Sequence, residues 1–173
     1  DSQRTFLQSW EEFSNDVNFT FPMRLWARAM NKVSSDVYLY WFNYHPPVLG
    51  RQYKAFHGAD LPYVFGQLDM FGGDPEAADF VDADTMMSLW ARFASTGNPN
   101  GEGIIDWEAF TPNNESYFIL GPDNAPARNL RLERMDLIEK AWGIRRVQGT
   151  PSLPAVMPTG IKDLMLRCKG ANP

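Results

Sequence analysis

The chain has 173 residues and a formal net charge of −5, and 44% of its residues are hydrophobic and 14% aromatic. This length and apolar content suit one domain with a sizeable core and exclude a disordered chain. The acidic balance excludes the basic surface that binds nucleic acid, and no apolar run approaches the roughly 20 residues of a membrane-spanning helix.

The single cysteine, Cys168, cannot form a disulfide within the chain. It fits a reducing compartment or a bacterial exported protein equally well, so the localisation stays unknown, with the bacterial cytoplasm and export both open. The chain begins in mid-pattern at Asp1, without a methionine, and we expect its natural start to lie elsewhere.

The first 33 residues carry two helical patterns. Apolar residues recur at helical spacing at Phe6, Leu7, Trp10 and Phe13, and again at Met23, Leu25, Trp26, Ala29, Met30 and Val33. Between them, Ser14-Asn15-Asp16 predicts a break and a cap, and Pro22 suits the first turn of the second helix.

Residues 37–42 are continuously apolar or aromatic. Such a run is typical of strands that are covered on both faces in α/β proteins. Only residues 117–120 and 103–105 offer further strands. Because two or three strands cannot complete a sheet that is buried on both faces, the sequence predicts an α/β fold that is incomplete within this chain.

The stretch 56–66 places His57 and Gly58 after that strand-like run and before a short helix predicted at 61–70. Loops at strand ends carry chemistry, and histidine exchanges a proton near neutrality because its unperturbed pKa is about 6.5. His57 is therefore a candidate acid–base group, the alternative being a hydrogen-bonded structural histidine. We expect Asp60 to cap the helix, because adjacent residues rarely reach the far nitrogen of an imidazole. His45, which precedes two prolines, is assigned a surface or loop-packing role.

An acidic run follows, without a basic residue among its members: Asp69, Asp74, Glu76, Asp79, Asp82 and Asp84. Its spacing lacks the pattern of a calcium loop, so we predict a solvated, acid-rich helix start and no metal site. From Asp84 a helix is predicted to run to Gly97, followed by a turn at 97–101. Its apolar stripe is read as core.

The last predicted helix spans residues 130–142, with apolar side chains on one face. From Val147 onward, prolines interrupt the pattern, and 161–166 suits a short helical segment. We therefore divide the chain into a segment 1–146 and a proline-containing C-terminal tail 147–173, whose default role is a mobile tail or clasp.

Three stretches resemble the type-B carboxylesterase and cholinesterase-like family. Residues 57–66 resemble its histidine motif, H-G-x-[ED]-[LI]-x-[YF]-x-F-G. Residues 90–100 resemble its W-x-x-F-A-x-T-G-[DN]-P-N segment, and residues 107–111, followed by 117–120, resemble its closing W-P-x-[YF]-T and strand. The resemblance covers about residues 13 to 142.

The resemblance implies the C-terminal part of an α/β-hydrolase fold, made of the last sheet strands and their packing helices. It implies that His57 is the general base of a serine triad in an enzyme that hydrolyses small-molecule carboxylic esters through an acyl-serine intermediate. Gly58 would leave room beside the ring and Phe56 would line the cleft. No cofactor and no metal are implied.

The rest of a triad is not found in this sequence. The fold's serine occupies a G-x-S-x-G elbow, and its oxyanion donors come from a glycine-rich loop; neither pattern occurs here. Serine and acid precede histidine in the hydrolase order, yet Glu11, Glu12 and Asp16 lie too close to His57 to match the family's acid. We expect the upstream part of the enzyme, as a companion polypeptide, to supply both, and this chain alone to be inactive.

Two other interpretations stay open. The chain could belong to a non-catalytic cholinesterase-like binding or adhesion module, although the complete motif around His57 and the near-absence of cysteine argue against it. It could also be a fragment that folds alone, in which case uncovered strand faces would form apolar patches and cause association.

Overall fold

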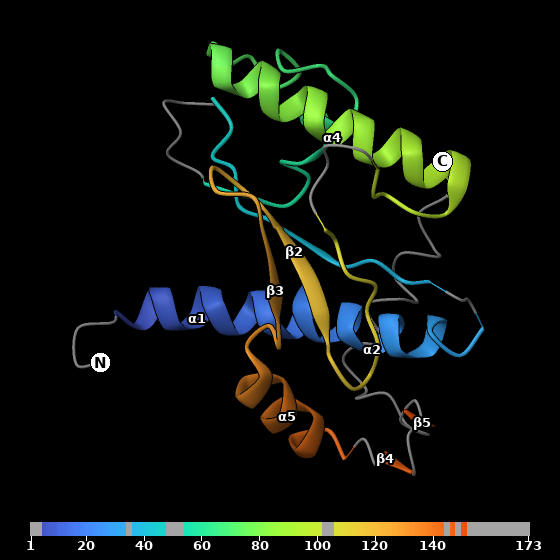
Figure 1. The fold of residues 1–173 in the computed structure, drawn as a ribbon. Helices are drawn as coiled ribbons and strands as arrows, with labels where there is room; N and C mark the ends of the chain where they lie inside the picture. The colour runs from blue at the N-terminus through green and yellow to red at the C-terminus, as the bar shows by residue number, and fades with distance from the viewer. Residues whose placement is uncertain are drawn as a thin grey trace, which may run out of the picture. The chain divides into compact units, whose positions relative to one another are not determined.

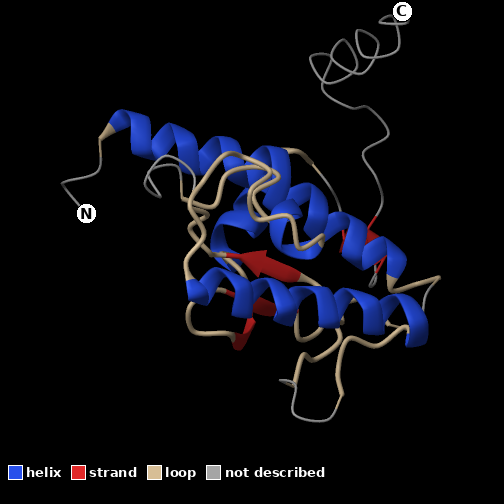
Figure 2. Cartoon of the chain, turned by 90° about the horizontal axis from the view of Figure 1, so that it is seen from above, coloured by secondary structure: helices blue, strands red, loops and turns tan. Residues whose placement is uncertain are grey.

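The computed structural model describes residues 5–33, 36–47, 54–101 and 106–143, together with the backbone of 146–147 and 150–151. The chain divides into two compact units, one from Asp1–Ala29 and Arg131–Pro173 and the other from Met30–Leu130. Figure 2 shows that helices supply most of the regular structure and that the strands are short. Within the described ranges, no helix is both long enough and apolar enough to cross a membrane.

The first unit begins with one uninterrupted helical run (Figure 1). The α-helix α1 (Phe6–Asn15) continues into the π-helix η1 (Asp16–Thr20) and then into α2 (Phe21–Met30). The break predicted at 14–16 is therefore wrong. The polar side chains support the helix instead, since the amide of Asn18 donates to the Ser14 carbonyl at 2.8 Å. Pro22 lies in the first turn of α2, as predicted.

Helix α5 (Leu132–Ala141) completes the core of this unit and confirms the last predicted helix. Phe21, Met135 and Ile138 are buried together, and Trp142 meets the Phe21 ring edge-on at 5.4 Å. Asp16, which is also buried, forms ion pairs with Arg131 at 2.6 Å and Arg134 at 3.0 Å. A short hairpin follows, formed by β4 (Arg146–Val147) and β5 (Thr150–Pro151).

Helix α2 is also tied to α5 by buried charges. The guanidinium of Arg28 lies 3.1 Å from the carboxylate of Glu139, and Arg24 reaches Glu139 at 3.5 Å and Asp136 at 2.9 Å. Arg24, Arg28 and Glu139 are all buried. Breaking such a pair leaves an uncompensated buried charge, so these contacts fix how α2 packs on α5.

The second unit contains a three-stranded sheet in the order β1-β2-β3. Strand β1 (Tyr40–Phe42) runs parallel to β2 (Ser116–Leu120), with Tyr40 opposite Phe118. Strand β3 (Ala125–Arg128) is antiparallel to β2. The chain thus combines a parallel pair, which needs a long crossover, with a hairpin.

The sheet is confirmed in part. The strand predicted at 117–120 is present, whereas the one predicted at 37–42 is shorter because the Val37 carbonyl accepts from Phe110, a loop residue, at 2.7 Å. The described residues do not cover β1 on both faces, since Tyr40 is 37% exposed. Strand β3 was missed because it contains Pro126, which weakens a strand pattern. Residues 103–105 and 161–166 lie outside the described residues, and the boundary at 146/147 stays a prediction.

Helix α4 (Ala77–Thr96) contributes Met86 and Leu89 to the core that contains Phe118 and Leu120 of β2, and the short helix α3 (Leu61–Val64) packs against α4. Both differ from prediction, since α3 ends six residues early and α4 begins at Ala77. The reason for the early start is a capping box, in which the Glu76 N–H donates to Asp79 at 2.8 Å. Gly97, with φ of 77°, ends α4 as predicted. The core of this unit contains Tyr44, Tyr63, Leu68, Ala83, Met86, Leu89, Trp107, Phe118 and Leu120.

Candidate active-site loop

His57 lies in a tight turn, residues 57–60, directly before α3. The Ala59 N–H donates to the Phe56 carbonyl at 3.0 Å, and the Leu61 N–H donates to the Gly58 carbonyl at 3.2 Å. Gly58 has φ of +81°, a conformation that side chains other than glycine rarely adopt. His57 itself is exposed, so the turn presents its imidazole at the surface of this unit.

Asp60 anchors the turn to the sheet. Its carboxylate Oδ2 accepts a hydrogen bond from the Tyr40 hydroxyl of β1 at 2.7 Å. The prediction that Asp60 caps the helix through its side chain is wrong, because no such hydrogen bond is present at the start of α3. Partial burial, the hydrogen bond to Asp60 and the charge of Asp60 all raise the pKa of Tyr40, so its hydroxyl keeps its proton at neutral pH.

Two further residues of the histidine motif fix α3 on α4. The Tyr63 hydroxyl donates to Asp79 Oδ1 at 2.8 Å, and both residues are buried. Asp79 is therefore not part of a solvated acidic run, contrary to the prediction. Gly66 has φ of +62°, and a Cβ there would lie 2.7 Å from the Met87 sulfur. Only glycine fits this conformation and this close approach without a shift.

Asn100, at the end of the second motif, binds Trp107, the first residue of the third. Asn100 Oδ1 accepts from the Trp107 N–H at 2.7 Å, and Asn100 Nδ2 donates to the Trp107 carbonyl at 2.9 Å. The indole Nε1 of Trp107 donates in turn to the Leu39 carbonyl, next to β1, at 3.0 Å. The two motifs thus connect the loop after α4 to the segment of β1, the strand that precedes the His57 loop.

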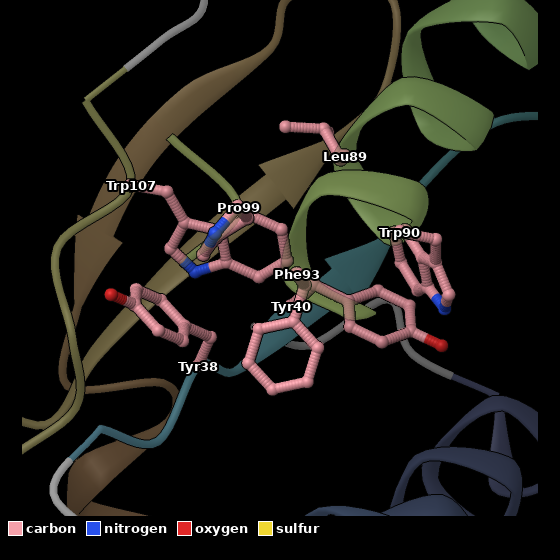
Figure 3. A pocket seen from close by; sticks show the side chains of 7 residues that line it. All are labelled: Tyr38, Tyr40, Leu89, Trp90, Phe93, Pro99 and Trp107. Carbon is pink, nitrogen blue, oxygen red and sulfur yellow. The ribbon is translucent and has the colours of Figure 1, made fainter. Parts of the chain in front are cut away.

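Trp107 also forms one wall of an aromatic hollow between β1 and α4 (Figure 3). The hollow has a volume of about 160 Å³. Its lining residues are Tyr38, Tyr40, Leu89, Trp90, Phe93, Pro99 and Trp107. Several rings meet edge-to-face, including Tyr40 and Trp90 at 5.0 Å. This geometry is favourable for aromatic pairs, so the hollow has well-supported walls.

The structure gives no functional role to His45 or to the acidic residues of the described chain as metal ligands. His45 is exposed, in agreement with its assigned surface role, while its neighbours Tyr44 and Pro46 are buried. In the described part of the chain, no group of three or more His, Cys, Asp or Glu residues is arranged to hold a metal ion. Sequence reasoning missed the partners of the loop, because no pattern links Tyr40 to Asp60 or Tyr63 to Asp79.

Comparison with known proteins identifies the family. The sequence profile of the Carboxylesterase family matches residues 1–138. The chain belongs to the carboxylesterase family. It is 33% identical over 147 residues to a human protein named cocaine esterase and 30% identical over 137 residues to the liver carboxylesterase of Sus scrofa. These matches cover 80% and 75% of this chain but only 25% and 24% of the relatives.

Solved carboxylesterase structures give the same result for the fold. A PNB esterase structure matches 79% of this chain with 29% identity and a TM-score of 0.66. The match covers 28% of that esterase. A carboxylesterase of Geobacillus stearothermophilus also matches 79% of the chain, with 27% identity, a TM-score of 0.66 and 29% of its own length. The predicted fold class is therefore confirmed: this carboxylesterase-family chain is part of an α/β-hydrolase fold and spans about a quarter of the relatives it matches.

Proposed function

We propose that this chain is the C-terminal part of a serine hydrolase that cleaves carboxylic esters, and that His57 is its general base. Family membership supports the ester-hydrolase class. The serine and the acid of the triad would come from the upstream part of the domain. This part is a companion polypeptide if the enzyme is split.

The observation that carries the proposal is that the other residues of the histidine motif hold the turn on which His57 lies. Gly58 and Gly66 adopt left-handed conformations, Asp60 bonds to β1, and Tyr63 bonds to α4. These residues have structural reasons to be present. They hold the turn to both a strand and a helix, and the turn presents the imidazole of His57 at the surface, which is the arrangement that a positioned acid–base group requires.

The chemistry assigned to His57 follows from a two-step acyl transfer. The imidazole takes the serine hydroxyl proton as the oxygen bonds to the ester carbonyl carbon, and it returns that proton to the alcohol as the ester C–O bond breaks. It then takes a proton from water, whose oxygen attacks the acyl-serine. Return of this proton to the serine oxygen releases the acid.

The unpaired edge of β1 supports the proposal that the upstream part of the domain packs against this chain. Leu39 accepts from the Phe118 N–H, and the Asn43 N–H donates to the Leu120 carbonyl, so odd-numbered residues of this segment face β2. Peptide groups alternate along a strand, and those of Tyr40 and Phe42 therefore point to the opposite edge. Among the described residues, β1 has a strand partner on one edge only. An edge of this kind is a template for a further strand.

Exposed apolar side chains of the first unit also support the proposal that an upstream part covers this chain. Phe6, Trp10 and Phe13 of α1 are 79%, 58% and 53% exposed, and Trp26 of α2 is 61% exposed. These residues form the apolar face that the sequence predicts for a packed helix. A folded domain rarely leaves several large apolar side chains of one helical run this exposed. We therefore expect the upstream part of the domain to cover it.

The test is hydrolysis of p-nitrophenyl acetate by the purified protein together with any polypeptide that copurifies with it. We expect His57→Ala to lower kcat/KM by roughly 10³-fold or more, as triad deletions do. His45→Ala is the matched control, because it removes the other histidine and should leave hydrolysis unchanged. Hydrolysis that survives His57→Ala would refute the role of His57. Hydrolysis by the 19.7 kDa chain alone would refute the need for a partner.

A companion polypeptide that is present without hydrolysis in the unaltered protein would give a different result. It would favour the non-catalytic binding or adhesion module, because the partner would then complete a fold rather than a triad.

A further inference from the structure

The hydrogen bond between Tyr40 and Asp60 joins two segments that meet at the His57 turn. The Tyr40 hydroxyl donates to Asp60 Oδ2 at 2.7 Å across twenty residues of sequence. The backbone carbonyl of Asp60 accepts from the N–H groups of Tyr63 and Val64 at 3.1 and 3.0 Å. Asp60 is thus bonded to β1 through its side chain and to α3 through its backbone, three residues after His57.

We propose that Tyr40 and Asp60 form a positioning pair that fixes the His57 turn against strand β1, an inference that rests on the proposed function of His57. Neither residue is assigned a chemical step. Their effect on catalysis would pass through the orientation of the imidazole, because loss of the bond removes the hydrogen bond that ties the turn to strand β1.

Tyr40 is itself well supported. Its ring meets Trp90 of α4 edge-to-face at 5.0 Å and lies 6.4 Å from Trp107 (Figure 3). Asp60 accepts through one carboxylate oxygen and is only partly buried. A short hydrogen bond to a carboxylate is stronger than one between neutral groups. The packing of its ring holds the Tyr40 phenol in place on β1, and the phenol hydroxyl binds the turn through the Asp60 carboxylate.

The expected effect on the reaction follows from the precision that proton transfer needs. A general base works only within hydrogen-bond reach of the proton that it removes, and a displacement of about 1 Å can cost up to 10²-fold in rate. Substrate binding depends on other surfaces. Loosening the turn should therefore lower kcat by roughly 10- to 100-fold and change KM little.

The chain offers two matched comparisons. Tyr38 lines the same hollow, but no hydrogen bond of its hydroxyl is present in the described part of the chain, so Tyr38→Phe removes a similar atom without touching the turn. Tyr63 makes a comparable bond to Asp79 at 2.8 Å, but this bond is buried and holds α3 on α4. Tyr63→Phe therefore reports what a purely structural tyrosine–aspartate bond contributes.

The first test is kinetic and uses the active protein in its purified, partner-containing form. We expect Tyr40→Phe and Asp60→Ala each to lower kcat at least tenfold, with KM within twofold of the original value. The double variant should be no slower than Asp60→Ala by more than twofold, because both changes break one bond. Tyr38→Phe should leave kcat unchanged. Additive losses, or an unchanged kcat in Tyr40→Phe, would overturn the proposal.

The second test is amide hydrogen exchange, which does not depend on activity. The Ala59 and Leu61 amides are hydrogen-bonded within the turn, so their exchange reports its opening. We expect at least tenfold faster exchange at both amides in Tyr40→Phe and no change in Tyr38→Phe. Unchanged exchange would overturn the anchoring. If the unaltered protein hydrolyses no ester but Tyr40→Phe still speeds this exchange, the proposed function fails while the anchoring holds.

Discussion

Replacing Asn100 by alanine should destabilise the second unit more than is usual for a side chain that is only partly buried. The side chain satisfies both backbone groups of Trp107, with Oδ1 2.7 Å from the N–H nitrogen and Nδ2 2.9 Å from the carbonyl oxygen. Trp107 is only 4% exposed, so water cannot easily replace the lost partners. Asn100 therefore acts as a clamp on a tryptophan that belongs to the core.

The magnitude can be worked from these two contacts. A buried polar group that loses its partner costs about 1–3 kcal/mol, so the two groups of Trp107 together should cost about 2–6 kcal/mol in the free energy of unfolding. For a chain of this size, each kcal/mol lowers the unfolding midpoint by about 2–4 °C. We therefore expect Asn100→Ala to lower the thermal midpoint by roughly 4–24 °C.

The assay is equilibrium unfolding in urea, followed by tryptophan fluorescence. Asn113→Ala is the matched control, because Asn113 is exposed and no hydrogen bond of its side chain is present in the described part of the chain. The control should change the free energy of unfolding by less than about 0.5 kcal/mol. If Asn100→Ala is no more destabilising than this control, the reasoning about the Trp107 clamp is wrong.

Three further changes test other parts of the structure. Gly66→Ala should cost about 1–3 kcal/mol of stability in urea unfolding, because its φ is +62° and the new Cβ would meet the Met87 sulfur; adding Met87→Ala should recover only the steric part. Asp16→Asn should cost about 1–2 kcal/mol, because it removes the charge of a buried carboxylate that pairs with the partly exposed Arg131 and Arg134 at 2.6 and 3.0 Å; no measurable loss would contradict this. Hydrogen bonds from Arg128, Ser116 and Asn114 and the charge of Arg128 lower the pKa of Glu108. The stability that Glu108 contributes is therefore fully present above its unfolded-state pKa and is lost as the pH falls through its lower folded-state pKa. Stability measured against pH should therefore fall less steeply in acid for Glu108→Gln than for the unaltered protein.

Periodicity predicted the helices better than their ends. The apolar stripe that ends at Gly97 located α4 and its C-cap, because a left-handed glycine is a strong local signal. The start of α4 was placed seven residues late, because the capping box of Glu76 and Asp79 is not one of the usual Ser or Thr caps. The π-helical segment η1 was missed, because Asp16, one of the polar residues that suggested a break, is used in contacts that only the folded chain forms.

The candidate site shows the same limit. His57 and the turn around Gly58 could be predicted, because the motif combines a titratable side chain with a glycine between a strand and a helix. The partners of Asp60 and Tyr63 could not, because Tyr40 and Asp79 lie 20 and 16 residues away and no spacing rule connects them. An acidic residue before an apolar helix is more often a cap than an anchor to a strand, so local propensity pointed to the wrong role.

The measurement that tests the central claim most directly is labelling of the purified preparation with a tagged fluorophosphonate, which reacts with activated serines, followed by intact mass spectrometry. We predict a labelled companion polypeptide beside an unlabelled 19.7 kDa chain, with the label lost in His57→Ala and kept in His45→Ala. A companion that still takes the label at an equal rate in His57→Ala, or that never takes it in the unaltered protein, would contradict the account.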